Sequence, residues 1–124
     1  MAAPKILVVE DYENLRRLVA HFLVRLDYTV LQAADGKTAI EIAVAEAPKL
    51  ILLDLLLPDI NGMEVARQLR GISLFQHIPI VGWTGNPIPR EQAILRTNLT
   101  DCLLKPVAPS VLRALIERFL PKQR

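Results

Sequence analysis

Five residues of chemically active types follow or close short apolar stretches of the chain, in places that apolar residues could have filled. They are three carboxylates, a hydroxyl and an ammonium: Glu10, Asp11, Asp54, Thr84 and Lys105. Carboxylates held a few ångströms apart raise one another's pKa values, and a hard divalent cation relieves that repulsion. Mg²⁺ suits such a site because it takes oxygen ligands and usually binds one or two carboxylates together with phosphate oxygens.

The same set of groups could move a phosphoryl group onto a carboxylate, because phosphoryl transfer depends mainly on positioning and charge neutralisation. Asp54 is the expected nucleophile, since the acidic pair should flank it on one side and Thr84 and Lys105 on the other. The ammonium of Lys105 can meet the phosphate, and the hydroxyl of Thr84 can hydrogen-bond a phosphoryl oxygen.

An alternation of strand and helix patterns must position these groups. Short runs rich in β-branched and apolar residues predict buried strands, and apolar residues at helical spacing predict amphipathic helices. The expected strands are residues 5–10, 28–33, 50–56, 79–84 and 101–105. The expected helices are residues 15–26, 38–46, 63–69, 89–96 and 110–120. Five strand–helix units predict a parallel sheet with helices on both faces, whose working residues lie beyond the carboxyl ends of the strands.

Composition limits the classes of protein that the chain can represent. Its 124 residues suffice for one domain with a hydrophobic core, and 52% are hydrophobic against 23% charged. No apolar run approaches the roughly 20 residues that span a bilayer, so no membrane contact is expected. The single cysteine, Cys102, fits a reducing cytoplasm. Basic residues are interleaved with acidic ones and lack aromatic neighbours, so we expect no direct nucleic-acid binding, and we expect Arg67 and Arg70 to be solvated.

Two other classes of phosphate-handling protein do not fit the first strand end. A dinucleotide-binding enzyme needs Gly-x-Gly-x-x-Gly there, whereas this chain has Val9-Glu10-Asp11-Tyr12-Glu13-Asn14. A flavin-binding module fails for the same reason. An aspartate-based phosphohydrolase would carry its nucleophile there in an Asp-x-Asp arrangement, and Tyr12 occupies the second of those positions.

Short motifs at successive strand ends give the chain a family resemblance. They are Ile6-Leu7-Val8-Val9-Glu10-Asp11, Leu53-Asp54-Leu55-Leu56-Leu57-Pro58, Asn61-Gly62, Trp83-Thr84-Gly85 and Leu104-Lys105-Pro106. In this order they resemble the receiver domain of bacterial two-component response regulators, of the chemotaxis-regulator type. The resemblance implies a flavodoxin-like three-layer αβα sandwich, with a five-stranded parallel sheet of order 2-1-3-4-5 and five helices. It implies one receiver domain over residues 1–124, with its core at about 5–120.

The resemblance also assigns roles within the site. It implies that Glu10, Asp11, Asp54 and the backbone carbonyl of Leu56 hold Mg²⁺, with Mn²⁺ as a possible substitute. Asp54 would be phosphorylated by a histidine kinase or phosphotransfer protein, and the domain would catalyse only that reaction and its own slow dephosphorylation. Thr84 and Lys105 would convert phosphorylation into a change of shape. A cis peptide is expected at Lys105-Pro106.

The partners follow from the same resemblance. The helix at residues 89–96, the strand at 101–105 and the helix at 110–120 imply a docking face and a possible homodimer. The chain ends within a few residues of the last expected helix, so we expect no output domain here, whether the protein acts alone or is part of a larger regulator or hybrid kinase.

Three positions depart from the family pattern. Glu10 stands where Asp is more usual, Gly85 where Ala is usual, and Cys102 where an aromatic residue usually couples the site to the rest of the domain. Leu56 and Asn86 occupy variable positions that flank the phosphate in this family. The apolar side chain of Leu56 cannot orient an attacking water, which predicts a long-lived aspartyl phosphate. Without the usual ring at Cys102, the signal must pass through Trp83 or the backbone of residues 89–96, or the output is weaker. The alternative function is a receiver-like interaction module that signals without phosphorylation.

Overall fold

Five parallel strands form one sheet in the computed structural model, which describes residues 3–85 and 98–121. The strands are β1 (Lys5–Val9), β2 (Thr29–Ala33), β3 (Leu50–Asp54), β4 (Ile80–Thr84) and β5 (Asp101–Leu104). Their order is β2-β1-β3-β4-β5, which confirms the predicted order. All five residues of the central strand β3 are buried, because neighbouring strands cover its edges and helices cover both its faces.

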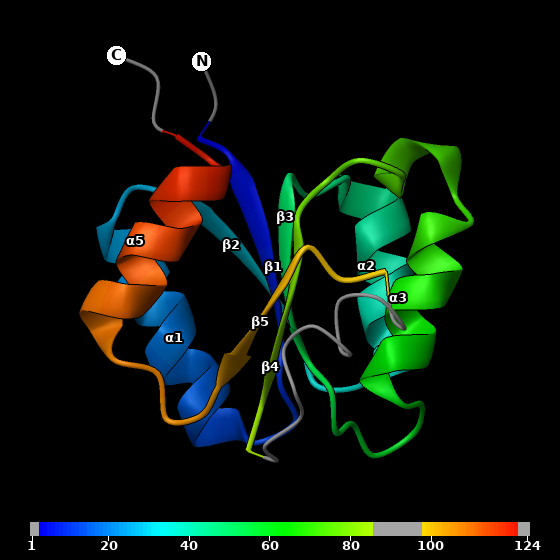
Figure 1. Cartoon of the computed structure of the whole chain (residues 1–124), viewed down its shortest axis with the longest axis horizontal. Coiled ribbons are helices and arrows are strands. Elements are labelled where there is room, and N and C mark those ends of the chain that lie inside the picture. The colour runs from blue at the N-terminus through cyan, green and yellow to red at the C-terminus, as the bar shows by residue number, and fades with distance from the viewer. Residues whose placement is uncertain (1–2, 86–97, 122–124) are drawn as a thin grey trace.

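Helices cover the sheet on both sides (Figure 1). They are α1 (Glu13–Arg25), α2 (Gly36–Glu46), α3 (Gly62–Arg70) and α5 (Pro109–Phe119). Helices α1 and α5 lie on one face and α2 and α3 on the other, which gives the predicted three layers. These are the four α-helices of the described residues, and the helix expected at residues 89–96 lies outside them.

Each face of the sheet has its own hydrophobic cluster. Leu7, Val9 and Leu53 belong to the cluster under α2 and α3, whereas Val8 and Leu52 belong to the cluster under α1 and α5. Successive side chains of a strand point to opposite faces, so β1 and β3 must be apolar at every position to serve both clusters. The two clusters pack against both faces of the sheet beneath the residues at its carboxyl edge.

Strand β3 ends at Asp54, two residues earlier than predicted. The Leu55 N–H still donates to the carbonyl of Trp83 on β4 (3.2 Å), but the Leu56 N–H turns to the side chain of Asp54 (2.9 Å). The chain therefore leaves the sheet directly after Asp54, whose carboxyl group accepts the hydrogen bond from the Leu56 N–H.

Helix α2 begins at Gly36, two residues earlier than predicted. Asp35 caps the helix by accepting a hydrogen bond from the Thr38 N–H (2.7 Å). A 3₁₀-helix at Ser73–Phe75, which the sequence analysis did not predict, buries Phe75 completely in the α2/α3 cluster.

The prediction that Arg70 is solvated is wrong. Its guanidinium donates to the carbonyls of Phe75 and Ile78 (both 2.7 Å), to that of Asn98 (3.0 Å) and to Thr100 Oγ1 (3.3 Å). Burial lowers the pKa of Arg70 from its ordinary value. Arg70 ties the end of α3 to the segments on either side of β4, whereas Arg67 is exposed and pairs with Glu64 as expected of a surface residue.

Within the part of the chain that the structure describes, no helix is both long and apolar enough to cross a bilayer.

Candidate functional site

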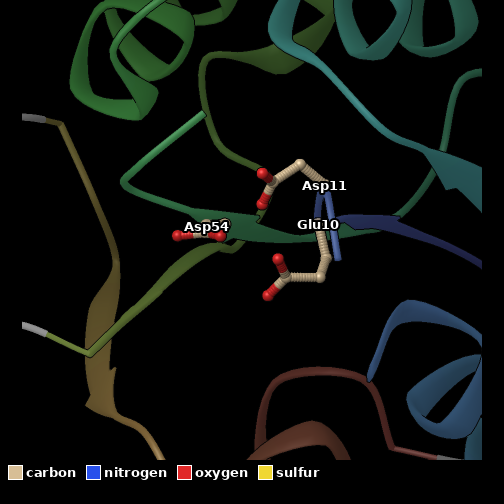
Figure 2. A group of neighbouring side chains, drawn as sticks. All are labelled: Glu10, Asp11 and Asp54. Carbon is tan, nitrogen blue, oxygen red and sulfur yellow. The ribbon is translucent and has the colours of Figure 1, made fainter. Parts of the chain in front are cut away.

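Three carboxyl groups meet beyond the carboxyl ends of β1 and β3. Glu10 and Asp11 directly follow β1, and Asp54 is the last residue of β3. The two strands are neighbours in register, with Val9 opposite Leu53, so their ends bring the three side chains together. One carboxylate oxygen from each lies within 4.8 Å of the other two. Figure 2 shows the three carboxyl groups around a common space, as the sequence analysis predicted.

The three carboxyl groups differ in their access to water. Glu10 and Asp54 are 1% and 3% exposed, whereas Asp11 lies at the surface. Glu10 Oε2 accepts a hydrogen bond from the Tyr12 N–H (3.1 Å), which fixes its carboxylate at the start of the loop. A hydrogen bond with the Glu10 side chain raises the pKa of Asp11 above its ordinary 3.8, and burial and the charge of Glu10 add to this effect. The site therefore brings together carboxylates whose mutual repulsion a neighbouring cation would relieve.

Lys105 supplies the positive charge among the described residues of this site. Its Nζ donates to Glu10 Oε1 and to Asp54 Oδ2, the latter at 3.2 Å. Burial alone would lower the pKa of Lys105, but the hydrogen bonds and charges of Glu10 and Asp54 outweigh burial and raise it above 10.5. The Lys105 N–H donates to the Thr84 carbonyl (2.7 Å), and the peptide to Pro106 is cis, as predicted.

Thr84 is the last residue of β4 and is 2% exposed. Strand β4 pairs with β3 so that Trp83 is opposite Asp54, and Thr84 lies one step further toward the carboxyl edge. The structure thus brings all five predicted residues to this edge. Leu56 joins them through its backbone N–H on Asp54 Oδ1, while its side chain is exposed.

Gly62 lets the loop after β3 return close to Asp54. A Cβ at Gly62 would lie 2.3 Å from the Asp54 carbonyl oxygen and 2.7 Å from the Leu55 Cα. The Gly62 N–H donates to the Leu55 carbonyl (3.2 Å), and Asn61 caps α3 through the Met63 N–H (2.9 Å). The Asn61-Gly62 motif therefore places the start of α3 against the backbone of Asp54 and Leu55.

Two residues that shape the site were not predicted from the sequence. The Asp59 carboxylate accepts from the N–H groups of Gly36 (2.8 Å) and Lys37 (2.9 Å), and these bonds lower its pKa. It joins the loop after β3 to the start of α2. Arg16 on α1 donates to the Glu10 carbonyl (3.0 Å) and holds the end of β1. A lone acid in a loop and a basic residue on a helix face carry no distinctive sequence signal, because their partners here are backbone groups that any residue could supply.

The carboxyl groups fit a single hard cation. Oxygen ligands of an octahedral Mg²⁺ lie about 2.1 Å from the ion, which places them roughly 3.0 to 4.2 Å from one another. The separation of the carboxylate oxygens of Glu10, Asp11 and Asp54, within 4.8 Å, is close to that spacing. The hydrogen bond with Glu10, burial and the charge of Glu10 raise the pKa of Asp11, and a cation bound beside these carboxylates would oppose the effect of that charge. These residues could therefore hold Mg²⁺.

Known proteins share this sequence and architecture. The profile of the response regulator receiver domain matches residues 6–117. The alkaline phosphatase synthesis transcriptional regulatory protein PhoP of Bacillus subtilis is 36% identical over 117 residues, covering 94% of this chain and 48% of that protein. The chain spans about half or less of the length of the curated relatives it matches.

Solved structures agree with the sequence relatives. The chemotaxis protein CheY4 of Vibrio cholerae superposes with a TM-score of 0.90 at 31% identity, covering 96% of this chain and all of that one. The receiver domain of the sensor histidine kinase PA1611 of Pseudomonas aeruginosa has a TM-score of 0.88 at 28% identity, covering 98% and 100%. That structure has a magnesium ion coordinated in its active-site cleft.

The chain belongs to the response regulator receiver domain family. It is a signalling domain of two-component systems rather than a conventional enzyme, and its acidic pocket is of the kind in which such domains accept a phosphoryl group.

Proposed function

We propose that this domain accepts a phosphoryl group on Asp54, in the presence of Mg²⁺, from a histidine kinase or a phosphotransfer protein. One observation carries the proposal: the buried Asp54 carboxyl group lies between two further carboxylates and an ammonium, with Lys105 Nζ 3.2 Å from Asp54 Oδ2. This arrangement pairs a nucleophilic oxygen with a cation site and a countercharge, which phosphoryl transfer requires. One receiver domain spanning about residues 5–120 would carry out this function.

Each residue has a defined part in the proposal. Glu10, Asp11, Asp54 and the Leu56 carbonyl hold the metal, with Mn²⁺ as a substitute. When bound, the ion neutralises negative charge on the phosphoryl oxygens. Thr84 donates its hydroxyl to one phosphoryl oxygen and Lys105 pairs with another. Lys105 then leaves Glu10 and Asp54 and pairs with the phosphoryl group. Because Lys105 directly follows β5, this change of partner alters the shape of that strand end.

The proposed step forms one bond and breaks one bond. A carboxylate oxygen of Asp54 attacks the phosphorus of a phosphohistidine, so that an O–P bond forms and the P–N bond breaks. The electron pair of the P–N bond remains on the imidazole nitrogen, which takes a proton from solvent. Lys105 and the metal-binding carboxylates orient Asp54 but are not themselves altered. Water later attacks the phosphorus, the O–P bond to Asp54 breaks, and inorganic phosphate leaves as Asp54 returns to its carboxylate form.

The partner classes follow from the relatives. Their names include transcriptional regulators and sensor kinases, so this domain would work with a histidine kinase, either as a separate protein or within the same one, in the cytoplasm. We also propose a homodimer through β5, α5 and the segment between β4 and β5. Exposed Leu104 and Val111 lie on the first two of these elements. Gel filtration with and without a phosphoryl mimic tests this dimer.

A second candidate function is a receiver-like module that signals by contact alone. Cys102 favours it, because a thiol stands where the family usually has an aromatic ring. The complete set of Asp54, Thr84 and Lys105 favours phosphorylation, since a contact module has no need of a buried carboxylate beside an ammonium.

Beryllofluoride, which mimics a phosphoryl group on a carboxylate, separates the two functions. Calorimetric titration in Mg²⁺ should show one bound beryllofluoride in the native protein and none in Asp54→Asn. Glu41→Gln, which removes an exposed carboxylate of α2 away from the site, is the matched control and should still bind. If the native protein did not bind beryllofluoride, the result would contradict phosphorylation of Asp54 and favour the module that signals by contact alone.

A further inference from the structure

The indole ring of Trp83 lies against the ammonium of Lys105. Lys105 Nζ is 4.7 Å from the ring centroid, within the range in which an aromatic face attracts a cation. The same ammonium donates to the carboxylates of Glu10 and Asp54. Lys105 therefore links the Trp83 ring to Asp54, the proposed phosphoryl acceptor, although Trp83 itself has no group that could react.

The partly buried environment of Lys105 strengthens the attraction between its ammonium and the Trp83 ring. The Lys105 side chain is only 20% exposed, so its ammonium has lost much of its water. On the side of α1 and α5 it borders a pocket of about 620 Å³ that is lined mainly by apolar side chains, including Leu15, Phe22 and Val107. Trp83 borders the same pocket, and its electron-rich face partly replaces the missing water on that side.

Packing alone is a poor reason for an indole at position 83. Trp83 is 2% exposed, and its Nε1 finds no hydrogen-bond acceptor among the described residues. A buried N–H without a partner is unfavourable, and Leu or Phe would fill a core position without that penalty. The contact between the ring face and the Lys105 ammonium gives a reason for an indole at position 83 that packing does not.

We propose that Trp83 is a positioning residue that holds the ammonium of Lys105 beside Glu10 and Asp54, where it can meet a phosphoryl group. The part that concerns the phosphoryl group rests on the function proposed above; the contact with Lys105 does not. Trp83 is opposite Asp54 in the register of β3 and β4, so the ring is fixed to the strand next to the acceptor. A ring anchored there fixes the ammonium relative to Asp54.

The Trp83 ring and the side chain of Cys102 lie on opposite faces of the sheet. Trp83 belongs to the cluster under α1 and α5, whereas Cys102 packs against the cluster under α2 and α3. Trp83 therefore links Lys105 to the opposite face of the sheet and does not fill the place that Cys102 leaves open.

The first test compares Trp83→Leu, Trp83→Phe and the native protein in Mg²⁺ by calorimetric titration with beryllofluoride. Loss of the ring should weaken beryllofluoride binding by about three- to tenfold, the worth of a partly desolvated cation–π contact, and Phe should restore most of that loss. Leu115→Ala removes packing from the same cluster without touching Lys105, and should bind as the native protein does. Native affinity in Trp83→Leu, or an equal loss in Leu115→Ala, would overturn the inference.

The second test needs no metal or phosphoryl mimic. The ε-methylene signals of Lys105 should show the upfield ring-current shift of a group over an indole face, and Trp83→Leu should abolish it. If Trp83→Leu does not fold, the contact is tested from Lys105: Lys105→Met should change the emission of Trp83, and Lys105→Arg should keep it closer to native. No ring-current shift in the native protein, or unchanged emission in Lys105→Met, would refute the contact. Failure of the native protein to bind beryllofluoride would instead count against the proposed function.

Discussion

Lys105 Nζ lies 3.2 Å from Asp54 Oδ2, although 51 residues separate the two in sequence and β4 lies between their strands. The same ammonium donates to Glu10, so one cation bridges two of the three carboxylates of the site. In the metal-free protein Lys105 therefore provides part of the positive charge that a bound Mg²⁺ would otherwise supply. Both the stability of the domain and its binding properties should depend on this bridge.

Lys105→Met should destabilise the metal-free protein. It leaves two almost fully buried carboxylates without their countercharge, which we expect to lower the free energy of unfolding by about 1–3 kcal/mol after allowing for the partial exposure of Lys105. Urea denaturation without Mg²⁺ measures this change. Lys5→Met is the matched control, because the Lys5–Glu46 pair is exposed and its loss should cost about 0–1 kcal/mol. Equal effects of the two substitutions would contradict the bridge.

Asp11→Asn should weaken Mg²⁺ binding while stabilising the metal-free protein. The substitution removes a charged ligand from the cation but also removes a like charge from beside Glu10. A lost charged ligand worth about 1.5–3 kcal/mol corresponds to roughly 10- to 100-fold in affinity. Calorimetric titration with Mg²⁺ and urea denaturation in a chelator measure the two effects, and unchanged Mg²⁺ affinity would exclude Asp11 as a ligand.

The pH dependence of the same residue has a definite sign. The pKa of Asp11 is raised above 3.8 in the folded state, so folding favours its protonated form. Its contribution to stability is complete below pH 3.8 and is lost as the pH rises through the folded-state pKa. Protons also compete with Mg²⁺ for this carboxyl group, so Mg²⁺ affinity should fall as the pH falls. Asp11→Asn should reduce both dependences, and profiles identical to those of the native protein would show that another group is responsible.

Gly62→Ala should disrupt the support of Asp54. Its Cβ would meet backbone atoms of Asp54 and Leu55, which cannot rotate away, so the start of α3 must shift. We expect a loss of about 1–3 kcal/mol in unfolding free energy and weaker beryllofluoride binding. Gly85→Ala is the control: its Cβ would meet no described atom within 4 Å, and the change should stay within about 0.5 kcal/mol. Similar losses in both variants would contradict the close approach.

Leu56→Asn should shorten the lifetime of the phosphorylated protein several-fold. Leu56 follows Asp54 by two residues, its side chain is exposed, and it cannot orient a water molecule for attack on the phosphoryl group. Loss of radiolabel from the phosphorylated protein measures the lifetime. Leu56→Ala separates polarity from access, because it opens the site without adding a polar group. If Asn gives no faster loss than Ala, orientation of water by residue 56 is not the cause.

The sheet and the five site residues could be predicted because their signals are local. Strands buried on both faces must be apolar throughout, so a charged or hydroxyl residue at the end of such a run is conspicuous. Glu10, Asp54 and Thr84 each stand at the end of such a run, and the parallel order of the strands brings them to one edge.

Contacts between residues far apart in sequence could not be predicted. Arg70 is half-buried and donates to carbonyls of residues that precede and follow β4, and nothing in its own helix indicates these contacts. Asp59 is similar, since its partners are backbone N–H groups at the start of α2. The early end of β3 depends on the Asp54 carboxyl group itself, which competes with the sheet for the Leu56 N–H.

Phosphorylation of Asp54 is the central claim, and covalent labelling tests it most directly. The protein is incubated with Mg²⁺ and radiolabelled acetyl phosphate, and label that is stable to denaturation but released by hydroxylamine is counted as acyl phosphate. We predict one labelled site in the native protein and in Glu41→Gln, little label without Mg²⁺, and none in Asp54→Asn. Equal labelling of Asp54→Asn, or no label in a native protein that is folded and binds Mg²⁺, would contradict the account.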